Sequence, residues 1–155
     1  MTNKPPLKER FFEDFEPGES FEFGEIHVSE EGIIEFAKNY DPQSFHIDPV
    51  AAKKSIYGSV IASGWHTGSM MMRCLVDHFV SENSMGSPGI ENLRWPHPVR
   101  GGDILRAKVT ITSARRSRSK PDRGILVNHS ALYNQDDVMV MEITSSSFIL
   151  CRDRA

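Results

Sequence analysis

One segment of the sequence, from Ser63 to about Glu82, limits the possible folds more than any other. It has the pattern of a helix that Ser63 can cap, and apolar side chains cover most of its surface. A helix with so much apolar surface has to be buried inside other structure. Its first turns contain Gly64 and Gly68, although a glycine inside a helix costs about 1 kcal/mol relative to alanine. We therefore expect another part of the protein, or a ligand, to approach the start of this helix closely.

The segments around this helix predict the structure that covers it. Apolar and polar residues alternate from Leu105 to Ile111, and two further strands are expected at 125–133 and 138–150. A strand at 21–28 and an amphipathic helix at 30–40 precede the buried helix. This order predicts an α+β fold in which a curved antiparallel sheet wraps around one long central helix. One sheet of this kind leaves its edges unpaired, so we also expect a homodimer or a higher homo-oligomer built from dimers.

Length and composition restrict the class of protein. We expect a loosely ordered arm at 1–14 and a single domain at 15–155. The net charge of −3 argues against a nucleic-acid-binding protein. Because the chain has no apolar run that could cross a membrane and no apolar signal segment at its start, we expect a cytoplasmic protein with no membrane partner. Cys74 and Cys151 form neither a metal-binding spacing nor a disulfide framework, so we expect reduced, buried thiols and no metal.

The segment between the two predicted helices, Asp41 to Pro49, carries the first candidate for chemistry. Asp41 and His46 lie five residues apart in a loop bounded by prolines, a spacing that lets both side chains converge on one point. A carboxylate and an imidazole that share a water can move protons in both directions near neutral pH. The structural alternative is an ordinary Asp-Pro turn at the end of a helix.

The second candidate is the start of the buried helix, Ser63-Gly64-Trp65. The first backbone N–H groups of a helix have no partner within the helix and carry partial positive charge. Gly64 would let a substrate come close to such an N–H, which could stabilise the enolate of an acyl thioester. The structural alternative is a tight strand-to-helix corner that needs small residues.

A third segment, 93–103, has the local pattern of a strand that ends in a bend. It contains Trp95, then Pro98-Val99 and Gly102-Asp103. Taken together, the three segments resemble the MaoC-like hydratases, a family that includes the R-specific enoyl-CoA hydratases. In that family an aromatic residue precedes Pro-Val and Gly-Asp in the same way.

The other two segments carry the same resemblance. The family loop runs Asp-x-Asn-Pro-x-His-x-Asp, and this sequence keeps Asp41, His46 and Asp48 at the matching positions. The family's helix start, often His-Gly-Met, lines up with 63–65 at the same distance downstream. The resemblance covers roughly 15–150, nearly the whole chain.

The resemblance implies a hot-dog fold and hydration of a 2-enoyl thioester, or the reverse dehydration of a 3-hydroxyacyl thioester, in fatty acid metabolism. It implies Asp41 and His46 as the catalytic pair of this lyase and the Gly64 N–H as the oxyanion donor. The substrate would be an acyl-CoA or an acyl-carrier thioester, so no separate cofactor is expected, since coenzyme A is part of the substrate. The residues expected to contact the substrate are Gln43, Ser63, Trp65 and Met72.

Two departures from the family pattern keep other functions open. Gln43-Ser44 replaces the family's Asn-Pro, and Met72 stands where the family has a serine. A thioesterase on the same fold and a non-catalytic acyl-CoA-binding dimer are therefore the alternatives. The one basic cluster contains Arg115 and Arg116, which could bind the phosphates of coenzyme A or could only be solvated charges beside a strand edge.

Overall fold

The computed structural model describes residues 4–153. Two short 3-10 turns, η1 (Leu7–Glu9) and η2 (Phe12–Asp14), precede the main elements. The strands and helices that follow are, in chain order, β1 (Ser20–His27), α1 (Glu30–Tyr40), α2 (Ser44–Ile47), α3 (Pro49–Lys54), α4 (Gly64–His78), β2 (Gly89–Arg94), β3 (Ile104–Arg116), β4 (Arg123–Tyr133) and β5 (Met139–Leu150).

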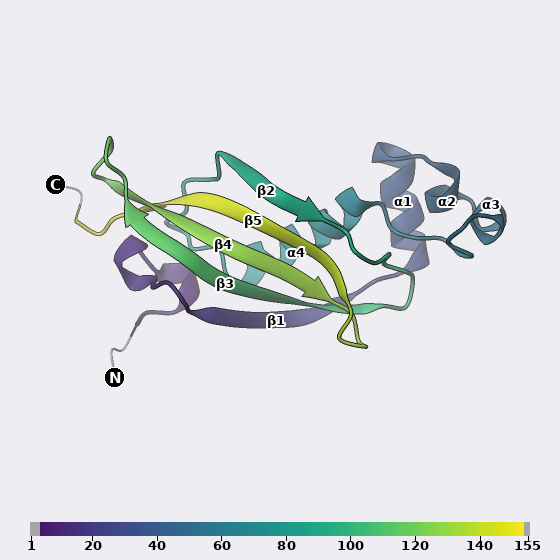
Figure 1. Ribbon diagram of the computed structural model, residues 1–155, viewed down its shortest axis with the longest axis horizontal. Coiled ribbons are helices and arrows are strands. Elements are labelled where there is room, and N and C mark those ends of the chain that lie inside the picture. Colours follow the sequence, from purple (N-terminus) through teal and green to yellow (C-terminus); the bar gives the residue numbers. More distant parts are fainter. Residues whose placement is uncertain (1–3, 154–155) are drawn as a thin grey trace.

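The strands form one antiparallel sheet in the order β1-β3-β4-β5-β2. Its curved inner face lies over α4, and α1, α2 and α3 gather beyond one end of the sheet (Figure 1). The alternation predicted for β3 is present, because Leu105, Ala107, Val109 and Ile111 are all fully buried. The predicted α+β architecture, a curved sheet around one long helix, is confirmed.

Helix α4 is buried on one side only. Thr67, Met71 and Cys74 are buried in the core, where the cluster around Met71 includes residues of β3, β4 and β5. On the other side, Trp65 is 59% exposed and Met72 is 51% exposed. A single chain therefore covers less of this helix than its apolar sequence predicts.

The helix also ends earlier than the expected position near Glu82. The N–H groups of Phe79 and Val80 both donate to the Leu75 carbonyl, and α4 ends at His78. Beyond that point the Ser81 hydroxyl donates to the Arg10 carbonyl at 2.6 Å. The chain leaves the helix because its polar groups bond to the N-terminal segment instead.

That N-terminal segment differs from the expected loose arm. Residues 4–14 fold against the body of the protein, and Phe12 is only 8% exposed. The Phe12 ring lies against Gly124, where a Cβ atom would come within 2.0 Å of the ring. Adjacent prolines disfavour an α-helix, but they do not prevent two 3-10 turns that direct an aromatic side chain into the core. The first three residues of the expected arm lie outside the described residues.

Within residues 4–153, no helix combines the length and the apolar character needed to cross a membrane. Cys74 and Cys151 are free and buried, in agreement with the expectation from their spacing.

Candidate active site

Asp41 lies at the C-terminal end of α1, where Pro42 prevents the helix from continuing. Its backbone N–H donates to the Ala37 carbonyl at 2.8 Å. Both carboxylate oxygens accept hydrogen bonds: the Ser63 hydroxyl donates to Oδ2 at 2.6 Å and the Gln43 amide donates to Oδ1 at 2.8 Å. The start of α4 and the loop after α1 therefore hold this carboxylate in one orientation.

These hydrogen bonds also keep the carboxylate charged. The pKa of Asp41 is lowered, first by the Ser63 hydroxyl bond, and then by the Gln43 amide and the nearby His46, against the opposing effect of partial burial. Hydrogen bonds to the charged form of a carboxyl favour that form. Asp41 is therefore ionised near neutral pH and available to accept a proton.

His46 comes from α2 and is 4% exposed. Its Nδ1 lies 2.6 Å from the Ile61 carbonyl oxygen, which can only accept, so Nδ1 carries the hydrogen. Nε2 lies 3.3 Å from Asp41 Oδ2, and because both atoms are acceptors when the ring is neutral, a proton or a water has to join them. The carbonyl of Ile61 thus fixes the tautomer that a general base at Nε2 requires.

Gly64 is the first residue of α4, and the indole ring of Trp95 packs directly on it. A Cβ atom at this position would lie 2.5 Å from the ring, so only glycine fits. Within the described part of the chain, no acceptor takes the Gly64 N–H, whereas the Trp65 N–H donates to the Ser63 hydroxyl at 3.3 Å. The close approach predicted at the start of the helix is confirmed, and a tryptophan makes it.

These groups surround one cavity of about 450 Å³. It brings together six of the residues expected at the site: Asp41, Gln43, His46, Ser63, Gly64 and Trp65. Tyr57, Trp95 and His97 also line it, and of these Tyr57 has no signal in the sequence that would place it there. His97 Nδ1 lies 3.0 Å from the Met139 carbonyl oxygen, which ties the rim of the cavity to the start of β5.

Three expected site residues lie elsewhere. Met72 lines a second, more apolar cavity of about 390 Å³ between α4 and the sheet, not the cavity of Asp41. Arg115 and Arg116 lie where β3 meets β4, at the end of the sheet opposite α1, α2 and α3 (Figure 1). Arg116 there forms an ion pair with Glu13 at 2.6 Å. Within one chain, neither arginine is near the cavity of Asp41.

Comparison with known proteins gives the family. The family model described as "MaoC like domain" matches residues 13–131. The crystal structure of a MaoC-like dehydratase from Rhodospirillum rubrum is 36% identical, with 93% of this chain and 99% of that chain covered and a TM-score of 0.88. The chain belongs to the MaoC-like domain family.

Two further comparisons extend this result. YdeM of Bacillus subtilis (strain 168) is 28% identical over 131 residues, which are 84% of this chain and 92% of that protein. R-hydratase PhaJ1 from Pseudomonas aeruginosa has a TM-score of 0.71 over 92% of this MaoC-like chain and 86% of its own, at 18% identity. That likeness concerns the fold alone, and it agrees with the hot-dog fold implied by the sequence resemblance.

Proposed function

We propose that this MaoC-like protein adds water to a 2-enoyl thioester, or catalyses the reverse dehydration of a 3-hydroxyacyl thioester. The proposal depends on one observation. An ionised carboxylate, an imidazole with its hydrogen on Nδ1 and the first residue of α4, whose N–H has no acceptor among the described residues, line the same cavity.

Each group has a role in this reaction. Asp41 and His46 bind one water, take a proton from it and return a proton to the α carbon, while the hydroxyl adds to the β carbon. The Gly64 N–H stabilises the negative charge that develops on the thioester oxygen. In dehydration the reaction runs in reverse: the pair removes the proton from the α carbon and returns a proton to the hydroxyl, which leaves the β carbon as water. The two groups act as a coupled pair, so either can be the one that takes the first proton.

The second cavity is the natural place for the acyl chain. Trp65 and Trp95 line both cavities, and their rings meet edge to face with centroids 5.5 Å apart. A chain that passes this pair enters the space beside Met72. Phosphate binding by Arg115 and Arg116 stays a prediction, and their position at the far end of one chain gives it no support.

We also propose that the protein works as a homodimer. Among the described residues, β2 is an edge strand that pairs with β5 alone. Exposed apolar residues lie on it and on the neighbouring face of α4: Ile90 and Met72, which also border the second cavity, and Val76. Unpaired strand edges and apolar patches of this kind are typical of subunit interfaces. The molecular mass in solution tests this. A cytoplasmic location stays a prediction, with the two free thiols in its favour.

A panel of 2-enoyl-CoA thioesters, assayed by the loss of absorbance of the conjugated double bond, tests the proposed function. We expect hydration of at least one member of the panel, with product formation reversible from the 3-hydroxyacyl thioester. Release of free thiol from a saturated acyl-CoA would indicate a thioesterase instead. Tight acyl-CoA binding without water addition to any enoyl chain would indicate a binding protein.

Replacement of Ser63 by alanine should move the acidic limb of the kcat/KM profile to higher pH. The hydroxyl bond lowers the pKa of Asp41, so its loss raises that pKa, and protonation of the base then begins at a higher pH. The variant should also lose about 1 kcal/mol of stability, because Ser63 caps α4. A pH series of initial rates measures the shift.

Ser29→Ala is the matched control, because Ser29 caps α1 through the Gly32 N–H and does not line the cavity. It should lose similar stability and keep the wild-type pH profile. The same acidic limb in Ser63→Ala and wild type would show that the hydroxyl does not control the base.

A further inference from the structure

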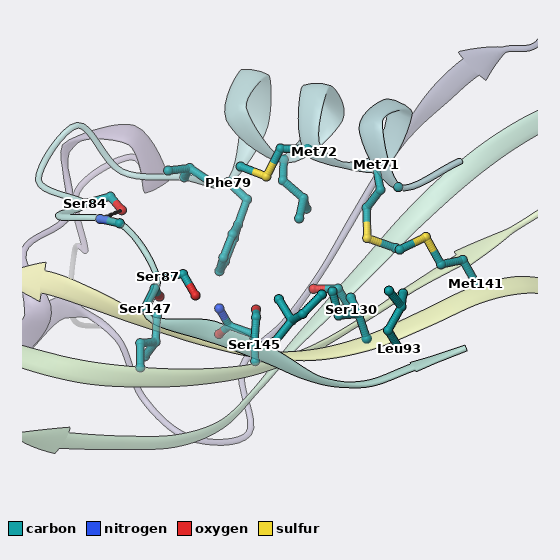
Figure 2. A pocket seen from close by; sticks show the side chains of 18 of the residues that line it. Met71, Met72, Phe79, Ser84, Ser87, Leu93, Ser130, Met141, Ser145 and Ser147 are labelled. Carbon is teal, nitrogen blue, oxygen red and sulfur yellow. Dashed lines mark hydrogen bonds between the residues drawn. The ribbon is translucent and has the colours of Figure 1, made fainter. Parts of the chain in front are cut away.

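The second cavity combines largely apolar walls with a polar floor, and further serines, among them Ser84 and Ser87, line it at one end. Met71, Met72 and Leu75 line it from α4, and Leu126, Met141 and Ile143 line it from the sheet. Figure 2 shows Met71 reaching from the helix toward Met141, with Ser130, Ser145 and Ser147 standing on the opposite strands. Among the described residues, no Asp, Glu, Lys, Arg or His lines this cavity.

Four polar side chains on the inner face of the sheet form the floor: Asn128 and Ser130 on β4, and Ser145 and Ser147 on β5. Asn128 and Ser145 are direct cross-strand neighbours. Within residues 4–153, none of the four side chains makes a hydrogen bond to another protein group, and Asn128 is only 6% exposed. Such positions on a central strand ordinarily hold apolar residues, as Leu126 and Leu132 do on the same face.

A buried amide without a partner is costly. Loss of its hydrogen bonds to water disfavours the folded state unless another group replaces them. The floor is the feature of this cavity that packing does not explain, since leucine would fill the place of Asn128 at no such cost. A bound molecule that hydrogen-bonds to the amide would give it a function.

The chemistry of the lining defines that molecule. A carboxylate or an ammonium group would be buried here without a counter-charge, which excludes a charged group. The buried atom of Asn128 without a partner is Oδ1, an acceptor, so the matching group has to donate a hydrogen bond, as an uncharged hydroxyl does. His97, at the rim of the first cavity, contacts Met139 at the start of β5. Ser145 lies four residues beyond Met141 on the same strand, about 13 Å farther from that end. A hydroxyl of the substrate that bonds to this floor is therefore far along the acyl chain from the carbons that react.

We propose that the preferred substrate is an acyl thioester whose chain carries a hydroxyl group at its distal end, bound by Asn128 and Ser145. This inference rests on the proposed function, because it takes the second cavity as the site of the acyl chain. It selects uncharged, hydroxylated chains over plain alkyl chains of the same length.

Pairs of 2-enoyl-CoA thioesters of equal length, one with a terminal hydroxyl and one with a terminal methyl, test the proposal. Over a series of lengths, the wild-type protein should favour the hydroxylated member by about tenfold or more in kcat/KM at its best length. Asn128→Leu should bring this ratio close to one, because the hydroxyl then meets an apolar side chain. A ratio that is the same in Asn128→Leu and wild type overturns the proposal, and indicates that the polar floor holds only water.

Two serine variants control the comparison. Ser145→Ala should lower the preference in part, and it tests the floor even if Asn128→Leu does not fold. Ser146→Ala changes the adjacent residue of β5, which points to the opposite face of the sheet and does not line the cavity. It should keep the wild-type ratio.

A failure of the proposed function is distinguishable from a failure of this inference. If no enoyl thioester is hydrated, the proposed function is wrong, and calorimetric binding of the matched saturated acyl-CoA pair still tests the cavity. Tighter binding of the hydroxylated member to wild type, lost in Asn128→Leu, supports the inference. Equal affinity for both members in the wild-type protein overturns it.

Discussion

Asp41→Asn should lower kcat/KM for the hydrated thioester by about 10²- to 10⁴-fold, the usual contribution of general acid–base catalysis. Asparagine has the same size and still accepts the hydrogen bond from Ser63, but it has no charge and does not take a proton from water. The fold should persist, because the buried core does not include this side chain. Initial rates and a thermal unfolding curve of the same preparation measure both effects.

Asp48→Asn is the matched control for this variant. Asp48 lies in the same loop and caps α3 by accepting from the Val50 and Ala51 N–H groups, and its side chain is exposed outside the cavity. Asparagine caps a helix as well as aspartate does. Loss of this carboxylate should therefore leave activity unchanged. A fully active Asp41→Asn protein would remove the proposed pair.

Gly64→Ala should have the second large effect. The new Cβ atom would lie 2.5 Å from the Trp95 ring, so the ring or the start of α4 has to move. We expect a loss of about 1–3 kcal/mol in the free energy of unfolding, as for other overpacked sites. Because the moved N–H no longer faces the thioester oxygen, kcat/KM should fall by about 10²- to 10³-fold. Denaturant unfolding and initial rates measure the two losses.

Gly68→Ala makes the same change one turn later in α4. There the new Cβ would meet the Met141 methyl group at 3.5 Å, an ordinary contact. This variant should be as stable as wild type, or more stable by up to about 1 kcal/mol, because alanine is the better helix former. A smaller side chain at Trp95 in the Gly64→Ala background should recover stability if the clash causes the loss. Unchanged stability in Gly64→Ala would contradict the tight contact.

Local patterns in the sequence were sufficient to predict the main elements. The helix at 30–40 has a serine cap, two acidic residues in its first turn and regular apolar spacing, and α1 occupies that range. The convergence of Asp41 and His46 was predicted from a short segment bounded by prolines, which restricts where two side chains can point, although the structure places His46 on the short helix α2 and not in a loop. Such features depend on neighbours in the sequence and can be read from it.

Contacts between distant segments could not be predicted in this way. Ser63 was expected to cap α4, but its bond to Asp41 joins residues 22 positions apart. Trp95 was recognised as part of a motif, yet nothing in its own segment indicates that it packs on Gly64. The polar floor does not follow from the sequence of β5, because Met139, Met141 and Ile143 alternate as in an ordinary half-buried strand and the inward positions after them are serines. Only the sheet register shows that Asn128 joins them.

The position of Trp65 and Trp95 between the two cavities has a practical consequence. They are the 2 tryptophans of the chain, so all of its indole fluorescence comes from this pair. A ligand that occupies either cavity changes the polarity around at least one ring. The protein therefore carries its own optical reporter of substrate entry, and its emission spectrum follows binding without an attached dye.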